Sequence, residues 1–114
     1  MNNLKNSVQL MGYLGADPDF KKLENGSSLA KFRMATNEIY TNKNGDRVET
    51  TYWHNCIGWG KQAEVMNQIL RKGKEVLVRG KLTYNTYEDK QGNTRHVPEI
   101  VVNEFSLTSK KASA

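Results

Sequence analysis

The aromatic and basic residues of this chain are the ones whose arrangement along the sequence suggests a binding surface. Trp53 and Trp59 are six positions apart, so an unbroken β-strand would place both on the same face. Tyr40 and Tyr87 each lie beside a polar loop. Exposed flat rings stack on unpaired nucleic-acid bases, while lysines and arginines contact the phosphates. The basic residues on the same stretches are Lys31, Arg33, Lys43, Lys61, Lys72, Arg79 and Lys81.

The same residues also have a purely structural interpretation. Aromatic side chains on strands are commonly core residues, and lysines commonly form a solvated surface. Gly58 and Gly60 flank Trp59 and give its ring little cover, which favours its exposure. Trp53 is equally consistent with a buried and an exposed position. The formal net charge of +5 is too modest to establish nucleic-acid binding by itself.

The sequence lacks the residue clusters that catalysis or metal binding would need. His54 and His96 are the only histidines and Cys56 is the only cysteine, whereas a structural zinc site needs four ligands in paired clusters. His54 and Cys56 share a face of one predicted strand, which favours packing or interface roles. Residues 58–61 lack the spacing and the Ser or Thr of a phosphate-binding loop, and the acidic residues form no convergent pair. We therefore expect a non-enzymatic protein without metal or cofactor.

Length and composition narrow the class further. The chain has 114 residues, 37% of them hydrophobic, which suffices for one small barrel or sandwich and not for a large enclosed active site. No apolar run is long enough for a transmembrane helix, and residues 1–6 carry no secretion signal. The lone cysteine fits a reducing compartment. These features predict a small, basic, cytoplasmic domain with no membrane partner.

The periodicity of apolar residues predicts the strands and the helix on which the aromatic residues lie. A helical spacing of apolar residues over 60–72 predicts one helix, with Gly73 as its cap. A short extended piece is expected at 20–23, and a hairpin turn at 88–93 with a return arm at 94–97. Alternation of apolar and polar residues predicts the main strands, over residues 7–15, 29–36, 50–58, 75–87 and 100–102.

Five strands with one helix between the third and the fourth favour an all-β fold, a small five-stranded Greek-key barrel of the OB type. A split β-sandwich or an SH3-like barrel would satisfy the same pattern. We expect residues 1–108 to form this single domain and residues 109–114 to form a short, flexible, basic tail.

Several ordered motifs give the chain a resemblance to bacterial single-stranded DNA-binding proteins. Residues 12–18 (GYLGADP) resemble the opening of that family, and residues 34–38 (MATNE) resemble its Leu-Ala-Thr-Asn-Glu stretch. Residues 53–61 (WHNCIGWGK) are similar to its Trp-His block. Further similar segments, in the same order and over about residues 4–107, are Ala63–Val65, Leu70–Gly73, Gly80–Leu82 and Asp89–Gly92.

The resemblance implies an OB-fold that binds single-stranded DNA without sequence preference in replication, recombination and repair, usually as a homotetramer at the nucleoid. By position, the base-stacking sites of the family fall on Tyr40, Trp53, Trp59 and Tyr87. The resemblance also implies subunit contacts for His54. It places Lys61 and Lys72 near the DNA path; Lys31, Arg33 and Lys81 complete the expected nucleic-acid-binding set.

The chain departs from the family pattern at several positions. Asn55 stands where Arg is frequent, and residues 83–85 replace a stretch that is often rich in Arg. Lys31 and Arg33 stand where neutral residues are common and compensate in part. The chain resembles a short form without the acidic C-terminal tip, because residues 109–114 contain no acidic residue. Recruitment of replication and repair enzymes by such a tip is therefore not expected.

Two alternative functions share the predicted fold. One is a related OB-fold accessory that prefers RNA or fork DNA, which the 2′-hydroxyl would distinguish. The other is an assembly subunit without a nucleic-acid role, for which Trp53 and Trp59 would be buried in a subunit interface.

Overall fold

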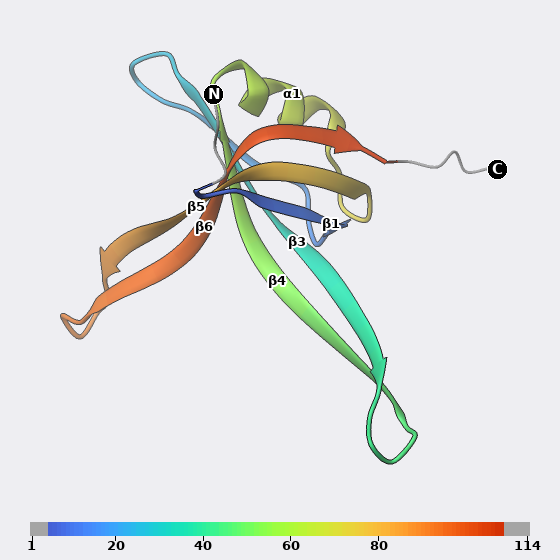
Figure 1. Ribbon diagram of the computed structural model, residues 1–114. Coiled ribbons are helices and arrows are strands. Elements are labelled where there is room, and N and C mark those ends of the chain that lie inside the picture. Colours follow the sequence, from blue (N-terminus) through green and yellow to red (C-terminus); the bar gives the residue numbers. More distant parts are fainter. Residues whose placement is uncertain (1–4, 109–114) are drawn as a thin grey trace.

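Six β-strands and one α-helix make up most of the chain in the computed structural model, which describes residues 5–108. Residues 109–114, predicted as a basic tail, lie outside the described residues. The elements are β1 (Val8–Leu14), β2 (Asp19–Lys22), β3 (Ser28–Thr41), β4 (Arg47–Trp59), α1 (Lys61–Ile69), β5 (Glu75–Glu88) and β6 (Thr94–Leu107) (Figure 1).

The strands form one sheet that closes on itself. The order is β1-β5-β6-β4-β3-β2, and an additional pairing of β1 with β3 closes five of the strands into a barrel. The short β2 pairs only with β3 and lies outside the closed ring. The prediction of an all-β, five-stranded OB-fold is thus confirmed, and the closed sheet excludes a split sandwich. As predicted, the helix follows the third strand of the barrel. That strand is labelled β4, because the short β2 outside the barrel is included in the numbering.

The core is built by alternation along the strands and by one face of α1. Phe32, Met34 and Cys56 point inward from β3 and β4, and Met66 is the central apolar side chain of α1. A Cβ atom on Gly58 would lie 2.5 Å from the Met66 sulfur. The absence of a side chain at Gly58 therefore lets α1 pack directly on β4.

The helix is shorter than its periodicity predicts. It ends at Ile69, and Leu70 has extended backbone angles (φ −84°, ψ 135°), so Gly73 is not its cap. Leu70 is fully buried, and we attribute the early end to this side chain turning into the core. Arg71 donates hydrogen bonds to the carbonyls of Asn67 and Leu70, and so still satisfies the end of the helix.

The prediction of a separate return arm and final strand was wrong, because β6 runs unbroken through Pro98. Tyr84 pairs with Pro98 on one side of β6. On the other side β4 pairs with β6 only through Ile100 and Val101. One edge of β6 is therefore unpaired at Pro98, and a residue without an N–H group is tolerated there.

Two β-ribbons extend from the barrel in different directions (Figure 1). The β3–β4 arm consists of the outer parts of these strands and turns at residues 42–46. The β5–β6 arm turns at residues 89–93. The β3–β4 arm is longer than the alternation predicts, since the outer part of β3 is exposed on both faces and carries no apolar pattern. The hairpin of the β5–β6 arm lies where it was predicted, because β5 ends at Glu88 and β6 begins at Thr94.

Candidate nucleic-acid interface

Trp53 and Trp59 project from the same outer face of the barrel. Trp59 pairs with Leu29 and Trp53 with Ala35, and no register shift intervenes between β3 and β4. Side chains alternate between faces, so the odd-numbered residues of both strands share this face. The exposed fraction is 50% for Trp53 and 47% for Trp59. The expected exposure of Trp59 is confirmed, and the undecided position of Trp53 is resolved as exposed.

The indole of Trp53 is held on this face by two neighbours. The guanidinium carbon of Arg33 lies 4.8 Å from the centroid of the Trp53 ring, a cation–π arrangement. A Cβ atom on Gly15 would lie 2.6 Å from Cζ3 of Trp53, so the ring packs against bare backbone. These contacts orient a large flat surface before any ligand arrives, which reduces the entropy lost on binding.

A row of paired residues extends this face across four strands. Lys31 on β3 pairs with Ile57 on β4, Ile57 pairs with Val101 on β6, and Val101 pairs with Lys81 on β5. Lys31 and Lys81 are both exposed. Two of the predicted phosphate contacts therefore flank a shared surface, although they come from strands fifty residues apart in the sequence.

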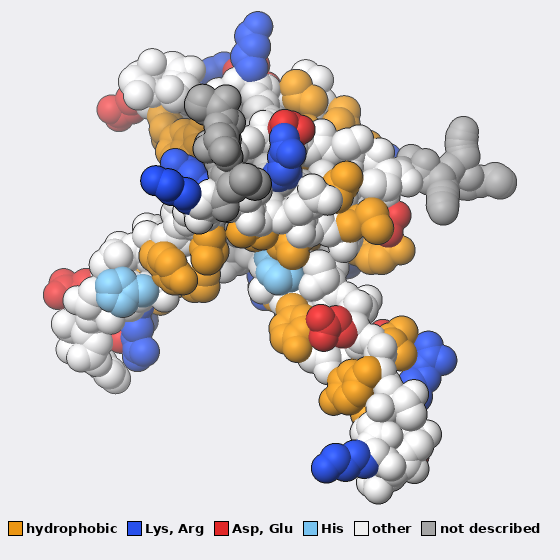
Figure 2. Space-filling model, in the orientation of Figure 1, with side chains coloured by type: hydrophobic (Ala, Val, Ile, Leu, Met, Phe, Trp, Pro, Cys, Tyr) orange, Lys and Arg blue, Asp and Glu red, His pale blue; other side chains and the backbone are white. Residues whose placement is uncertain are grey.

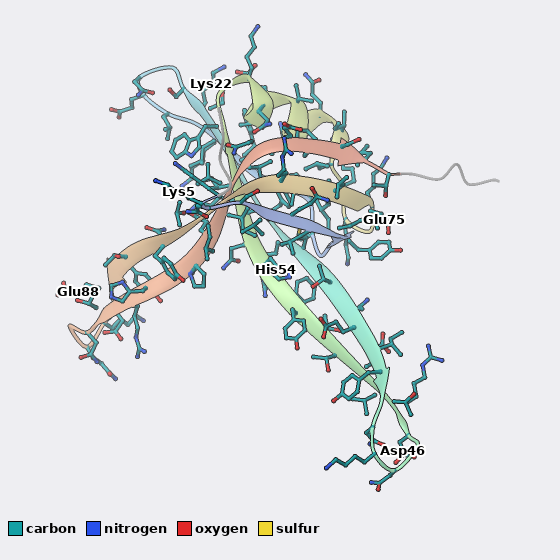
Figure 3. The ribbon with its side chains drawn as sticks, viewed as in Figure 1. Lys5, Lys22, Asp46, His54, Glu75 and Glu88 are labelled. Carbon is teal, nitrogen blue, oxygen red and sulfur yellow. The ribbon has the colours of Figure 1, made fainter. Side chains whose placement is uncertain are left out.

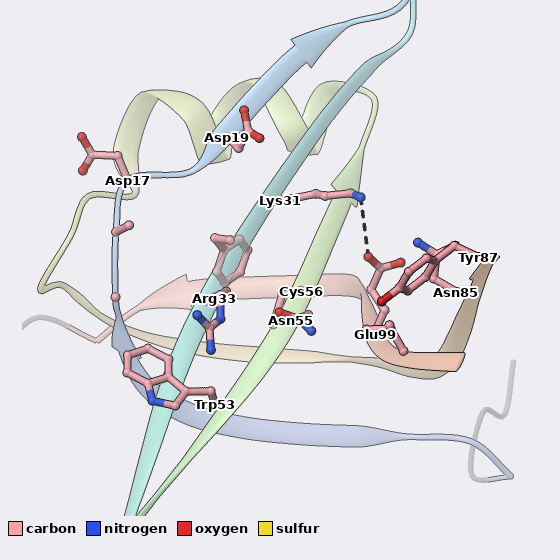
Figure 4. Close-up of a pocket in the computed structure, with 14 residues that line it drawn as sticks. Asp17, Asp19, Lys31, Arg33, Trp53, Asn55, Cys56, Asn85, Tyr87 and Glu99 are labelled. Carbon is pink, nitrogen blue, oxygen red and sulfur yellow. Dashed lines mark ion pairs between the residues drawn. The ribbon is translucent and has the colours of Figure 1, made fainter. Parts of the chain in front are cut away.

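A pocket of about 460 Å³ opens where this face meets the β5–β6 arm (Figure 4). Trp53 from β4 and Tyr87 from β5 both line it, and Tyr87 is 50% exposed. The pocket thus brings together two of the predicted stacking residues and both Lys31 and Arg33. The other lining residues are Gly15, Ala16, Asp17, Asp19, Phe32, Asn55, Cys56, Asn85, Val97 and Glu99.

Glu99 is the acidic residue in the interior of this pocket. Its side chain is only 14% exposed, and its Oε2 lies 3.9 Å from Nζ of Lys31 (Figure 4). Burial raises the pKa of the nearby Cys56 thiol to about 12, and the negative charge of Glu99 adds to the shift. Cys56 is therefore a protonated core residue near neutral pH and does not supply a thiolate.

Tyr40 is not brought to this pocket. It pairs with Val48 at an even-numbered position of β3, so it projects from the other face of the β3–β4 arm than Trp53 does. It is 53% exposed. Figure 2 shows hydrophobic side chains along both arms; those with large exposed fractions include Ile39, Tyr40, Tyr52, Tyr84 and Tyr87.

The remaining predicted residues lie around the rim or apart from it. Lys61 begins α1, two positions after Trp59, and is exposed. Lys72 is exposed in the turn after α1, where its backbone N–H donates to Oδ1 of Asp17, a residue that lines the pocket. Each of these lysines therefore adjoins the aromatic face without lining its centre.

His54 lies on the opposite face of β4 from the two indoles. It is half-buried at the base of the β3–β4 arm (Figure 3), and Nε2 is 2.9 Å from the hydroxyl of Thr36. Burial lowers the pKa of His54 below its ordinary value, so the ring is neutral near neutral pH. A role of His54 in subunit contacts stays a prediction.

Glu99 was missed by the sequence reasoning, and Asn55 and Asn85 were noted only as departures from a family pattern. Asn55 is adjacent to Arg33 through the β3–β4 pairing, while Asn85 pairs with Val97. A single strand through Pro98 would place Val97 and Glu99 on the same face. A break was expected between residues 97 and 100, so this shared face was not predicted. Among residues 5–108, no cluster of three or more His, Cys, Asp or Glu side chains is arranged to hold a metal ion.

Comparison with known proteins decides the family. The model of the single-strand binding protein family matches residues 5–108, which is nearly the whole chain. The chain belongs to this family. It is 36% identical over 107 residues to single-stranded DNA-binding protein 1 of Xylella fastidiosa, covering 93% of this chain and 79% of that protein. It is 35% identical over 109 residues to single-stranded DNA-binding protein 1 of Chlorobaculum tepidum, covering 95% of this chain and 67% of the relative.

Among solved structures, this family member is similar to a Plasmodium falciparum SSB in complex with ssDNA. The TM-score is 0.80 at 28% identity, and the match covers 90% of this chain and 91% of the other. The resemblance inferred from the motifs is therefore confirmed. In the described residues, helix α1 spans nine residues, and no helix is long and apolar enough to cross a membrane.

Proposed function

We propose that this family member binds single-stranded DNA without overall sequence preference and protects exposed strands in replication, recombination and repair. The observation that carries the proposal is the pair of half-exposed indoles, Trp53 and Trp59, on one face of the barrel beside Lys31 and Arg33. Family membership and the similarity to an SSB bound to ssDNA support the same ligand.

Binding combines stacking with phosphate contacts. Trp53, Trp59 and Tyr87 offer rings to successive bases along the face and the pocket, and Tyr40 offers one farther along the β3–β4 arm. Stacking of this kind contributes about 1–3 kcal/mol per base, a value measured on other single-strand-binding proteins. Lys31, Lys61, Lys72 and Lys81, with Arg33, contact the backbone of the strand. No catalytic step takes part, so the protein acts by occupancy alone, in the nucleoid region of the cytoplasm.

Assembly into a homo-oligomer, a homotetramer by analogy with the family, completes the proposed function. Strand β1 pairs with β5 along residues 8–13 but with β3 only at Tyr13 and Leu14, which leaves one edge of β1 unpaired over most of its length. Met11 and Tyr13 are exposed on the same strand. An unpaired edge with exposed apolar side chains is a natural pairing surface between copies. Native mass spectrometry would count the subunits.

A fluorescence titration tests DNA binding directly, because Trp53 and Trp59 are the only tryptophans. We expect oligo-dT to quench their emission strongly at low salt and less at moderate salt, while duplex DNA has little effect. Equal or stronger binding of oligo-U would favour the RNA-binding alternative. An unchanged emission with every nucleic acid would show that the aromatic face serves protein contacts.

A further inference from the structure

The pocket between the aromatic face and the β5–β6 arm differs in charge from the rest of the molecule. The whole chain carries a formal charge of +5, but three carboxylates and only two basic groups line the pocket. The excess of carboxylates disfavours a phosphate in the interior of the pocket, next to Glu99. An uncharged group that donates hydrogen bonds would be accepted instead.

Among the three carboxylates, Glu99 is the one available inside the pocket. Asp17 already accepts a hydrogen bond from the backbone N–H of Lys72, at 2.9 Å, and Asp19 is exposed at the margin. The Glu99 carboxylate lies 3.9 Å from Nζ of Lys31, which is too long for a direct hydrogen bond. Both carboxylate oxygens can therefore accept from a ligand.

Neutral polar groups and flat walls surround this carboxylate. The side chains of Asn55 and Asn85 line the pocket with Glu99 (Figure 4). Trp53 and Tyr87 contribute aromatic surfaces from two different strands (Figure 4). Apolar walls with a few convergent polar groups are typical of a small-ligand pocket, and about 460 Å³ accommodates one nucleoside.

We propose that this pocket is a base-recognition subsite that favours guanine, with Glu99 accepting from the N1–H and N2–H groups of the base. Guanine alone among the four DNA bases presents two adjacent donors on its Watson–Crick edge, and a carboxylate offers two adjacent acceptors. The proposal rests on the proposed binding of single-stranded DNA and adds a preference at one position of an otherwise unselective path. Lys31 is free to move from Glu99 to a phosphate when the strand binds.

Short oligonucleotides test the preference without altering the protein. The reference is a dT tract, and the comparison tracts carry guanine, hypoxanthine, adenine or cytosine at every third position. We expect the guanine tract to bind about fivefold or more tightly than the dT tract. Hypoxanthine keeps N1–H but lacks the amino group, so it should fall between them. Adenine stacks as a purine but offers one donor, so it should remain close to dT.

A variant then assigns the preference to Glu99. Glu99→Gln should reduce the ratio of guanine-tract to dT-tract affinity to near one, because an amide presents only one acceptor. Glu104→Gln is the matched control, because it removes the same charge from the same strand. It also breaks an ion pair, the one between Glu104 and Arg79, which lies away from the pocket. This control should keep the wild-type ratio.

The outcomes separate the two proposals. Equal affinity of all tracts, with dT binding intact, would overturn the subsite and leave the proposed function standing. Equal gains for adenine and guanine, or a preference that survives in Glu99→Gln, would also overturn it, because purine stacking would then be the cause. Failure to bind any tract would overturn both. The hypoxanthine series decides the matter even if Glu99→Gln does not fold.

Discussion

The two arms end in turns of the same construction and yet differ in what they bring to the binding face. At the β3–β4 tip, Oδ1 of Asn42 accepts hydrogen bonds from two backbone N–H groups, and Gly45 has a φ of 84°. At the β5–β6 tip, Oδ1 of Asp89 accepts two such bonds, and Gly92 also has a φ of 84°. Tip geometry thus follows from a few local residues and does not determine what an arm binds.

The difference lies in which side of each arm faces the pocket. The β5–β6 arm directs Asn85, Tyr87 and Glu99 into it. The β3–β4 arm contributes residues only near the barrel, where Arg33 and Trp53 lie, and its farther aromatic residues point elsewhere. Under the proposed function, binding energy should be concentrated around the pocket and should decrease toward the β3–β4 tip.

Removal of an indole beside the pocket should have the largest effect. Trp53→Ala deletes a ring that Arg33 and Gly15 orient, so we expect a loss of about 1–3 kcal/mol of binding free energy with the fold intact. Trp59→Ala should fall in the same range. Anisotropy of labelled oligo-dT measures the affinity, and circular dichroism checks the fold.

Tyr52→Ala is the control for Trp53→Ala. Tyr52 is the preceding residue on β4, is similarly exposed, and projects from the opposite face. We expect little change in affinity. If Tyr52→Ala and Trp53→Ala weaken binding equally, the strand does not prefer the pocket face at this position of β4.

Direct comparison of the arms comes from Tyr87→Ala and Tyr40→Ala. Both tyrosines are about half exposed, so the amount of accessible ring does not distinguish them. Tyr87 lines the pocket, so Tyr87→Ala should lose about 1–2 kcal/mol of binding free energy, whereas Tyr40→Ala should lose about 1 kcal/mol or less. The same anisotropy assay ranks the two variants, and a larger loss for Tyr40 would reverse the assignment of the arms.

Much of the barrel could be predicted from local pattern because its strands bury one face. Alternation locates β1, β5 and the inner parts of β3 and β4, where even-numbered residues such as Met34 and Val78 form the core. It fails in the outer part of the β3–β4 arm, since a strand such as β3 that is exposed on both faces loses the pattern. The prediction for helix α1 was too long because the helical spacing of apolar residues continues to Leu70. In the structure Leu70 lies just after the helix, in extended backbone, and its side chain is buried in the core.

Only part of the candidate site could be predicted from the sequence. Trp53 and Trp59 could be placed on one face, because both lie on a single strand without a bulge. The pocket could not be predicted, since it needs the pairing of β4 with β6 at Cys56 and Ile100. That long-range register brings Glu99 beside Asn55, and nothing near Glu99 in the sequence reports it.

Salt dependence should show which lysines contact the strand. Lys31→Gln and Lys81→Gln should each reduce the slope of log affinity against log salt by about 0.7, because one counterion-releasing contact is lost. Lys22→Gln is the matched control, since Lys22 lies on β2 and pairs with Glu64 of α1, away from the pocket. Slopes come from titrations at four or more salt concentrations, and an unchanged slope in Lys81→Gln would remove Lys81 from the phosphate contacts.

The smallest expected effect distinguishes the arm tips by pH. Backbone hydrogen bonding from Asn93, followed by the contact with Arg95, holds the pKa of Asp89 below its ordinary value. A depressed carboxyl pKa stabilises the folded tip above the unfolded pKa, and this contribution is lost as the pH falls through the lower folded pKa. Asn42, which makes the corresponding hydrogen bonds at the β3–β4 tip, does not titrate, so the β5–β6 tip should loosen more in acid than the β3–β4 tip. Amide exchange at Gln91 and Asn93 between about pH 2 and 5, with Asn44 and Asp46 as internal reference, measures the difference.

Asp89→Asn should make the two tips respond alike; a pH response that persists in this variant would assign the titration to another group.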